Sequence, residues 1–453
     1  MPRNAACHTD RVRAVFRKTL SPQGLDALAR ETRLIRRQRK VTAESFFWAF
    51  MVTLGGQTTE YISDVLRTLN AQEGWTLRYK PFWDRLAQRA FCAFMKSVFE
   101  RLCRELAVRV MDRVSGSAAS RFSDILADDG SSFGVADALR TVFPGRFTKF
   151  KPAAVELHAH LSVLSGNLKR VTLAPDKEPE RPFLPAPESL PKGSLSLRDR
   201  GYQDVSYFAA LSRRGAYLIC RAKRDVNPTI VRVVGGLPRR VAKKWEGKRL
   251  QQLRRTKLHR DLDLLVSWPR PKGEAVELRL VIRFVPEKKS WTWLLTNVPL
   301  DIAPETVGQL YRLRWQVELV FKDWKSYANL HALQSEHPAI VEGFIWASLS
   351  AAFLKRAVAH WAQLTTARPI STRLVAMSGR HLLPRLAHWA RGGFTVRGLD
   401  EILHFLLHNA LPTHPERRSA ENLVGLRPRT RIGPVSLRAG PPRMTARRPR
   451  IAA

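Results

Sequence analysis

One apolar stretch, YRLRWQVELVFKDWKS (311–326), carries reactive or charged side chains at spacings of three, four and seven residues: Tyr311, Arg314, Glu318 and Lys325. On a single helix turning roughly 100° per residue, these four fall within about 60° of each other, at one border of the apolar face. Charges at such a half-buried border interact strongly because water is partly excluded. The simplest interpretation of the spacing is a surface ion pair between Arg314 and Glu318, which would stabilise the helix by about 0.2–0.5 kcal/mol.

The charge of the whole chain points to a polyanionic partner. The 453 residues include 77 Lys or Arg against 39 Asp or Glu, a net charge of +38. Neutralising DNA phosphates releases condensed counterions, which favours binding by such a polycation. A GC-rich genome would raise arginine content but does not require acids to be half as common as bases. Nucleic acid is therefore the favoured partner, ahead of an anionic membrane surface.

Cysteines and apolar runs argue against several other classes. The four cysteines show no CxxC spacing, so neither a zinc site nor a disulfide framework is predicted, as fits a cytoplasmic protein; they are Cys7, Cys92, Cys103 and Cys220. The N-terminal segment lacks the apolar core of a secretory signal. The longest apolar run, 343–354, is too short to span a bilayer and predicts a buried helix.

The elements that would position the charged residues change character along the chain. An amphipathic helical pattern covers the N-terminal region to about residue 115, and 58–89 predicts two helices around a turn at Gly74. That pair is interpreted equally well as a DNA-reading helix-turn-helix or as an ordinary helical hairpin. From residue 121 the period becomes that of strands, which gives a mixed α/β class with a central sheet. Its predicted elements are a strand at 121–133, a hairpin at 153–166 and 168–175, a strand at 194–199, a helix at 203–214 and a strand at 216–223.

Residues 224–299 interrupt this pattern and are interpreted as an inserted β-rich subdomain with a basic surface. Strands are expected at 262–268, 275–285 and 292–298. Helices resume near Pro304. The last 32 residues, from Asn422 onward, contain eight arginines and no acid, which predicts a disordered tail that binds nucleic acid nonspecifically.

The combination of motifs resembles the DDE transposases of bacterial insertion sequences, in the insertion-sequence-four group. Their signature of Tyr, two residues, Arg, three residues, Glu, six residues and Lys is matched by the four residues named first. ILADDGSSF and LSLRDRGYQDVSYFAAL resemble the family's blocks around its first and second catalytic Asp, and LTNVP (295–299) resembles the approach to the Glu helix. The similarity covers about 120–360.

The resemblance implies a ribonuclease H-like catalytic core with the β-rich insertion, a helical N-terminal domain and a helical, basic C-terminal region. Asp129 would lie on the first core strand, Asp199 at the end of the fourth and Glu318 on a later helix. The implied division is a DNA-binding domain at 1–118, the core at 119–223 and 300–362, the insertion at 224–299 and the C-terminal region at 363–453.

Asp128 and Asp129 are adjacent, and strand alternation sends them to opposite faces of the sheet. The family's pattern of Asp followed by Gly or Ser aligns on Asp129, with Gly130 and Ser131 after it. Asp128 stays open as the alternative ligand.

The chemistry implied by the family is phosphodiester cleavage by two metal ions. Three carboxylates, Asp129, Asp199 and Glu318, would hold two Mg²⁺ ions about 3.5–4 Å apart, for which Mn²⁺ is an expected substitute. Water would nick an element end, and the freed 3′-OH would attack the opposite strand or target DNA. The partners would be double-stranded terminal inverted repeats and target DNA, bound by a dimer, with no membrane, in the bacterial cytoplasm at the nucleoid.

Tyr311, Arg314 and Lys325 would contact phosphates near the scissile end, the Arg by its fork geometry. Trp291 or Trp293 would stack on a flipped base, although tryptophans in strands usually belong to a core.

Three alternatives stay open from the sequence. Glu156, His158 and His160 share a strand face and suggest a metal site, but satisfied polar groups are the more common arrangement. The whole chain is interpreted second as a catalytically silent DNA-binding protein derived from a mobile element. The third interpretation is a ribonuclease H-like nuclease without transposition.

Overall fold

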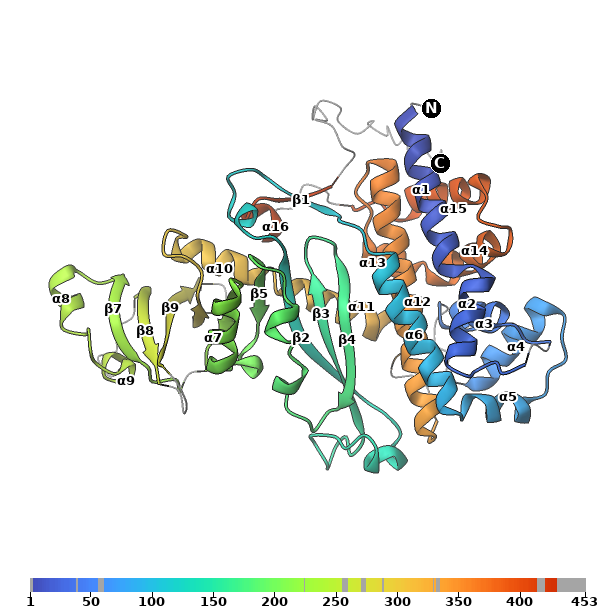
Figure 1. The fold of residues 1–453 in the computed structure, drawn as a ribbon, viewed down its shortest axis with the longest axis horizontal. Helices are drawn as coiled ribbons and strands as arrows, with labels where there is room; N and C mark the ends of the chain where they lie inside the picture. The colour runs from blue at the N-terminus through green and yellow to red at the C-terminus, as the bar shows by residue number, and fades with distance from the viewer. Residues whose placement is uncertain are drawn as a thin grey trace, which may run out of the picture.

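The computed structural model describes residues 3–37, 40–55, 61–223, 225–254, 260–269, 274–286, 289–328, 330, 335–413 and 420–429. It has a mixed α/β architecture, in which a large central sheet is bordered on one side by a body of helices (Figure 1). This confirms the mixed class expected from the sequence.

Nine strands form the central sheet in the order β4-β3-β2-β5-β6-β10-β9-β8-β7. In chain order they are β2 (Ile125–Gly134), β3 (Ala154–Ser162), β4 (Asn167–Pro175), β5 (Leu195–Arg198), β6 (Tyr217–Arg221), β7 (Thr229–Gly235), β8 (Leu262–Trp268), β9 (Val276–Val285) and β10 (Ser290–Thr296). Strands β4, β3 and β2 pair antiparallel, whereas β2, β5 and β6 pair parallel. The predicted hairpin and the strands on either side of it are therefore correct.

Helix α7 (Val205–Arg214) makes the crossover between the parallel strands β5 and β6. The Asp204 side chain accepts a hydrogen bond from the Tyr207 backbone N–H at its start, and Gly215 ends it in the left-handed region at φ 74°. Glycine adopts that conformation without the Cβ penalty, so the chain can turn directly into β6.

Residues 224–299, predicted as a β-rich insertion, contain strands β7 to β10. The three predicted strands correspond to β8, β9 and β10, whereas β7 was not predicted. Strand β10 pairs antiparallel with β6, so β7 to β10 extend the central sheet. The exposed edge of β6 would otherwise offer unpaired backbone groups, and β10 covers it. Two short helices, α8 (Arg239–Lys243) and α9 (Leu250–Arg254), lie at the far end of this extension (Figure 1).

The helical body combines both ends of the chain. Its members are α1 (Arg3–Leu20), α2 (Pro22–Glu31), α3 (Ala43–Gly55), α4 (Ile62–Glu73), α5 (Tyr79–Leu86), α6 (Arg89–Glu105), α12 (Pro338–Thr366), α13 (Thr372–Met377), α14 (Gly379–Arg391) and α15 (Val396–Asn409). Helix α12 packs against α6 and α3, α14 packs on α3, and α6 reaches β4 (Figure 1). The predicted helix pair at 58–89 is present as α4 and α5, with Gly74 at φ 64° ending α4.

Helix α12 is the buried helix predicted from the run 343–354. By length and composition this helix could cross a membrane, but 78% of its apolar window is buried inside the protein. The residue that follows this run, Lys355, is also buried. Its ammonium group donates hydrogen bonds to two backbone carbonyls.

The prediction of a disordered tail from Asn422 is wrong for its first residues. Helix α16 (Ala420–Leu423) and strand β11 (Leu426–Pro428) are formed, and β11 pairs antiparallel with β1 (Met111–Arg113). Burial of Val424 and Leu426 in the core accounts for this order. The rest of the predicted tail lies outside the described residues.

Candidate active site

Two acids predicted to be catalytic lie side by side at the edge of the parallel strands. Asp129 is on β2, and Asp199 follows the last residue of β5. The residues just before them, Asp128 and Arg198, are Cα partners in the parallel ladder. The ladder ends there, so Asp129 and Asp199 stand where the two strands begin to separate.

The segment 311–326 is two helices, so the prediction of one continuous helix is wrong. Helix α10 (Pro304–Arg312) ends at Leu313, and α11 (Trp315–Tyr327) begins after Arg314. Buried residues on both sides of the break, Leu310 in α10 and Val317 in α11, keep the apolar side of each helix in the core. Arg314 therefore lies at the start of α11, where its side chain reaches the sheet.

Contacts from these two helices join the three acids. Arg314 donates from Nη1 to Asp129 Oδ2 at 2.5 Å and from Nη2 to Glu318 Oε1. Tyr311 donates from its hydroxyl to Asp199 Oδ1 at 3.3 Å. The structure thus gathers Asp129, Asp199 and Glu318 around one tyrosine and one arginine, from two strands and two helices.

The electrostatics of Asp129 reflect this crowding. Burial raises the pKa of Asp129 to about 6 despite the opposing effects of Arg314 and the Gly130 N–H, and the charges of Glu318 and Asp199 add to the rise. The pKa of Arg314 is raised although burial opposes it, chiefly by Asp129 and then by Tyr311 and Glu318. Added positive charge would therefore be stabilised beside these carboxylates.

The donor chemistry fits a hard divalent cation. Carboxylate oxygens are the ligands that Mg²⁺ prefers, and the Arg314 guanidinium already lies between two of the three acids as a positive group. Among the described residues, no three His, Cys, Asp or Glu side chains are gathered closely enough to hold one ion. Arg314 would have to move away before Asp129 and Glu318 could bind the same metal ion.

Asp128 lies on the other face of the sheet, as strand alternation predicts. Arg198 donates from Nε to Asp128 Oδ2 at 2.8 Å, and His160 Nδ1 is hydrogen-bonded to the other carboxylate oxygen. Burial alone would raise the pKa of Asp128, but His160 and Arg198 outweigh it and lower that pKa to about 2. Its charge is therefore already compensated by protein groups.

The remaining predicted site residues lie further from the acids. Lys325 is exposed on α11, and its pKa is lowered by burial and by the nearby charge of Lys151. Trp291 packs against Phe284 with ring centroids 5.4 Å apart, and the Arg254 guanidinium lies 5.0 Å from the ring centroid of Trp293. Both tryptophans are partly buried on β10, as their core interpretation predicted.

Glu156 and His158 belong to a polar cluster on the Asp128 face, in which His158 Nε2 has no hydrogen-bond partner among the described residues. His158 Nδ1 lies 3.1 Å from the Tyr202 hydroxyl, and its ring stacks on Phe183 with centroids 4.1 Å apart. Arg146 donates to Glu156 at 3.3 Å. Burial, with the charge of Arg146, lowers the pKa of His158 to about 4, so the ring is neutral.

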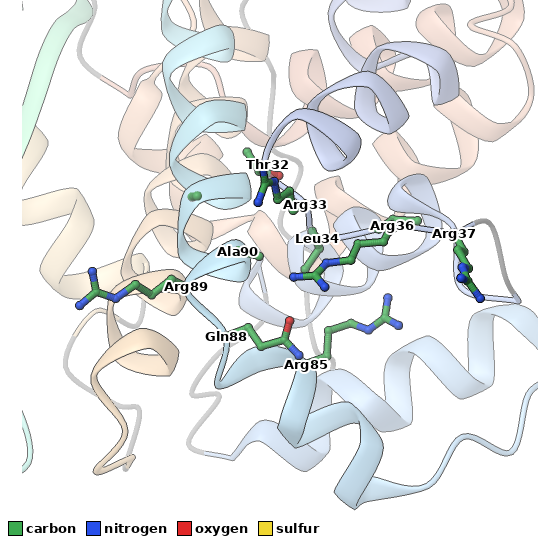
Figure 2. Close-up of a pocket in the computed structure, with 11 residues that line it drawn as sticks. Thr32, Arg33, Leu34, Arg36, Arg37, Arg85, Gln88, Arg89 and Ala90 are labelled. Atoms are coloured by element: carbon green, nitrogen blue, oxygen red, sulfur yellow. The ribbon is translucent and has the colours of Figure 1, made fainter.

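A second positively charged feature lies in the helical body. A hollow of about 950 Å³ lies between the turn after α2 and the corner of α5 and α6. Figure 2 shows the residues that line it. Five arginines and no acid line it: Arg33, Arg36, Arg37, Arg85 and Arg89. This hollow was not predicted from the sequence, because the two segments that line it are about fifty residues apart in the chain.

A family model matches more than half of the chain. The model of the family described as "Transposase DDE domain" matches residues 121–354. The transposase for insertion sequence element IS231B of Bacillus thuringiensis subsp. berliner is 23% identical over 368 residues, 74% of this chain and 77% of its own length. The putative transposase InsL for insertion sequence element IS186A of Escherichia coli (strain K12) is 41% identical over 91 residues, 20% of this chain and 23% of its own. A cryo-EM structure of piggyBac transposase in a synaptic complex with hairpin DNA has a TM-score of 0.44 at 10% identity, covering 90% of this chain and 86% of that chain.

Proposed function

The chain belongs to the DDE transposase family and is a DNA transposase, and from that premise we propose that Asp129, Asp199 and Glu318 are its catalytic acids. The observation that carries this proposal is the pair of bonds from Arg314 to Asp129 and Glu318, together with the bond from Tyr311 to Asp199. These contacts bring residues 112 to 185 positions apart in the chain to one place.

We infer that the core is ribonuclease H-like. The order of five strands, β4-β3-β2-β5-β6, supports this inference. Strands β4, β3 and β2 are antiparallel, β2, β5 and β6 are parallel, and helix α7 connects β5 to β6. Within this core the first strand carries Asp129 and the fourth ends at Asp199, which are the places that the resemblance implies.

The three carboxylates would hold two Mg²⁺ ions, with Mn²⁺ as a substitute. The metal supplies Lewis-acid stabilisation of the attacked phosphate and lowers the pKa of the attacking water. Asp129 would contribute to holding both ions, because the charges of both Glu318 and Asp199 act on it. The half-buried position of the acids limits water around them and strengthens their hold on cations.

Arg314, Tyr311 and Lys325 are the groups that would bind the DNA strand. Arg314 can exchange its carboxylate partners for phosphate oxygens, to which its fork geometry is equally suited. Tyr311 orients Asp199 by its hydrogen bond. Lys325 offers an exposed positive charge along α11, and Trp291 or Trp293 would supply base stacking in the sheet extension.

We propose that residues 1–118 bind DNA, with the arginine-lined hollow as the point of contact. Phosphate oxygens are the natural ligands of guanidinium groups, five of which line this hollow. The other proposed units are the core at 119–223 and 300–362, the sheet extension at 224–299 and the C-terminal region at 363–453. A dimer would hold two terminal repeats for transfer of the 3′-OH into target DNA, at the nucleoid in the cytoplasm.

A supercoiled plasmid carrying the element's ends tests the proposal. The parent protein is expected to nick it at those ends with Mg²⁺ or Mn²⁺ and to leave it intact with EDTA. Asp199→Ala is expected to bind the plasmid without nicking it. Equal nicking by Asp199→Ala would remove Asp199 from the site, cleavage without preference for the ends would favour a general nuclease, and binding without cleavage by the parent would favour a silent DNA-binding protein.

A further inference from the structure

The connection between β2 and β3 carries two exposed phenylalanines that the roles assigned above do not explain. Phe150 is 88% exposed and Phe147 63% exposed. They alternate with basic residues in the segment 146–151, RFTKFK, which contains no acid and is called the RFTKFK loop below. Large exposed aromatic side chains gathered at one place indicate a binding surface.

Hydrogen bonds close the base of this loop and hold its shape. The Gly145 N–H donates to the Pro152 carbonyl at 2.9 Å, and the Lys151 N–H donates to the Phe147 carbonyl at 2.7 Å. A Cβ on Gly145 would stand only 2.0 Å from the Lys151 carbonyl oxygen, so the closure requires glycine. Arg146 anchors the loop to the sheet through Glu156 and the Asp176 carbonyl. The two aromatic rings are therefore presented on a braced turn.

The RFTKFK loop is connected to a strand that carries a candidate catalytic acid. It follows the strand that carries Asp129, at the lower end of the β2–β3 hairpin in Figure 1. Lys151 and Lys325 are close enough for their charges to interact. Lys325 is seven residues after Glu318, about 10 Å along α11. Lys325 and Lys151 therefore place two neighbouring positive charges between the helix that carries Glu318 and the RFTKFK loop.

We propose that the RFTKFK loop is a further DNA-binding surface, on which Phe150 packs against unstacked bases beside the cleavage site while Lys149 and Lys151 contact flanking phosphates. The proposal rests on the proposed function to the extent that the same DNA must reach the three acids. Stacking on an aromatic ring is available to every base, so this contact would bind DNA without reading its sequence.

The charge around the phenylalanines favours DNA over a protein partner. A second copy of this chain would bring another strongly basic surface to the loop, and like charges would repel. A nucleic acid instead satisfies both kinds of side chain, since its phosphates pair with the lysines and its bases with the rings.

Binding of the full-length protein to a short duplex with an unpaired end, carrying 2-aminopurine at the junction, tests this proposal. Phe150→Ala is expected to weaken binding about 10-fold and to reduce the change in 2-aminopurine fluorescence, whereas Phe150→Trp should retain both. Phe150→Ala should leave the slope of log K against log salt unchanged. Lys149→Gln with Lys151→Gln should lower the magnitude of that slope by about 2.

Met377→Ala, which truncates an exposed apolar side chain at the end of α13, is the matched control and should bind as the parent does. Parental affinity and fluorescence in Phe150→Ala would overturn the proposal. A loss that is equal in Met377→Ala would also overturn it. Asp199→Ala is expected to bind this probe normally, so failure of the catalytic assignment and failure of the loop proposal give different results.

Discussion

Two buried arginine–aspartate pairs in the same sheet differ in how completely their hydrogen bonds are made. In the sheet extension, Arg279 donates to both oxygens of Asp263 at 2.8 Å, and its Nη1 donates to the carbonyls of Pro299 and Ile302. Beside the catalytic strands, Arg198 makes a single bond to Asp128, and its Nη1 has no partner among the described residues.

This difference in hydrogen bonding indicates different roles. The Arg279–Asp263 pair stabilises the sheet extension, whereas the Arg198–Asp128 pair lies beside the candidate site. Arg279 uses all three of its guanidinium nitrogens to fasten β8, β9 and the loop before α10. Asp128 and Arg198 each precede a candidate catalytic acid, and their bond is the last link before β2 and β5 separate. Incomplete hydrogen bonding is tolerated at functional sites when other requirements decide the arrangement.

The largest expected effect is on the rate of DNA cleavage, and it should distinguish Glu318 at the candidate site from Asp263 in the sheet extension. Glu318→Gln should lower the rate of DNA cleavage by on the order of 10³-fold or more, because a metal ligand supplies several kcal/mol of transition-state stabilisation. Asp263→Asn should leave the cleavage rate of the folded protein unchanged. Plasmid nicking per mole of folded protein measures both, and a comparable loss in Asp263→Asn would erase the distinction.

The second effect is on stability and should be greatest in the sheet extension. Arg279→Met leaves the buried Asp263 without its counterion, which should cost about 3–5 kcal/mol in the free energy of unfolding. Urea unfolding followed by circular dichroism measures this cost. A cost below about 1 kcal/mol would show that the pair does not close the fold.

The third effect concerns the pH dependence of stability at Lys355, a buried cation that donates its hydrogen bonds to backbone carbonyls. Burial lowers the pKa of Lys355 to about 8, and Asp323 only partly opposes this. The unfolded chain then binds more protons between pH 8 and about 10.5, so the stability of the parent should rise across that window by up to about 3 kcal/mol relative to Lys355→Met. Urea unfolding at both pH values checks the sign, and parallel curves for the two proteins would contradict it.

Apolar replacement of the pair beside the acids should separate folding from catalysis. Asp128→Leu with Arg198→Met should keep the protein folded, because buried ion pairs can often be replaced by apolar residues. Cleavage is expected to fall about 10-fold, since misplacing reacting groups slightly costs that much or more. Thermal unfolding and plasmid nicking are measured together, and unchanged cleavage would show that the pair does not position the acids.

The smallest effect concerns the arginine-lined hollow. Arg33 has φ 62°, a conformation that costs a non-glycine residue about 1 kcal/mol. Arg33→Gly should therefore maintain or raise stability while weakening duplex binding several-fold through the loss of one guanidinium. Arg397→Gln, which removes an exposed arginine on α15, is the charge-matched control. Equal weakening by both variants would argue against the hollow.

The sequence predicted elements and motif residues better than their connections. Alternation along β2 separated Asp128 from Asp129, and the spacing from Tyr311 to Lys325 identified the segment that contacts the acids. The break at Leu313 and Arg314 was missed because a wheel assumes one continuous helix. The Asp128–Arg198 bond and the β6–β10 pairing were missed because neither joins residues close in the chain. The order at Leu426 was missed because composition does not reveal its strand partner, Arg113.

The most direct test is a structure of the protein bound to an element end with Mn²⁺, analysed for anomalous scattering. We expect Mn²⁺ bound by Asp129, Asp199 and Glu318, with Arg314 moved from these carboxylates to a DNA phosphate. Mn²⁺ held elsewhere, with Arg314 still joining Asp129 and Glu318 in a complex that cleaves DNA, would contradict the account.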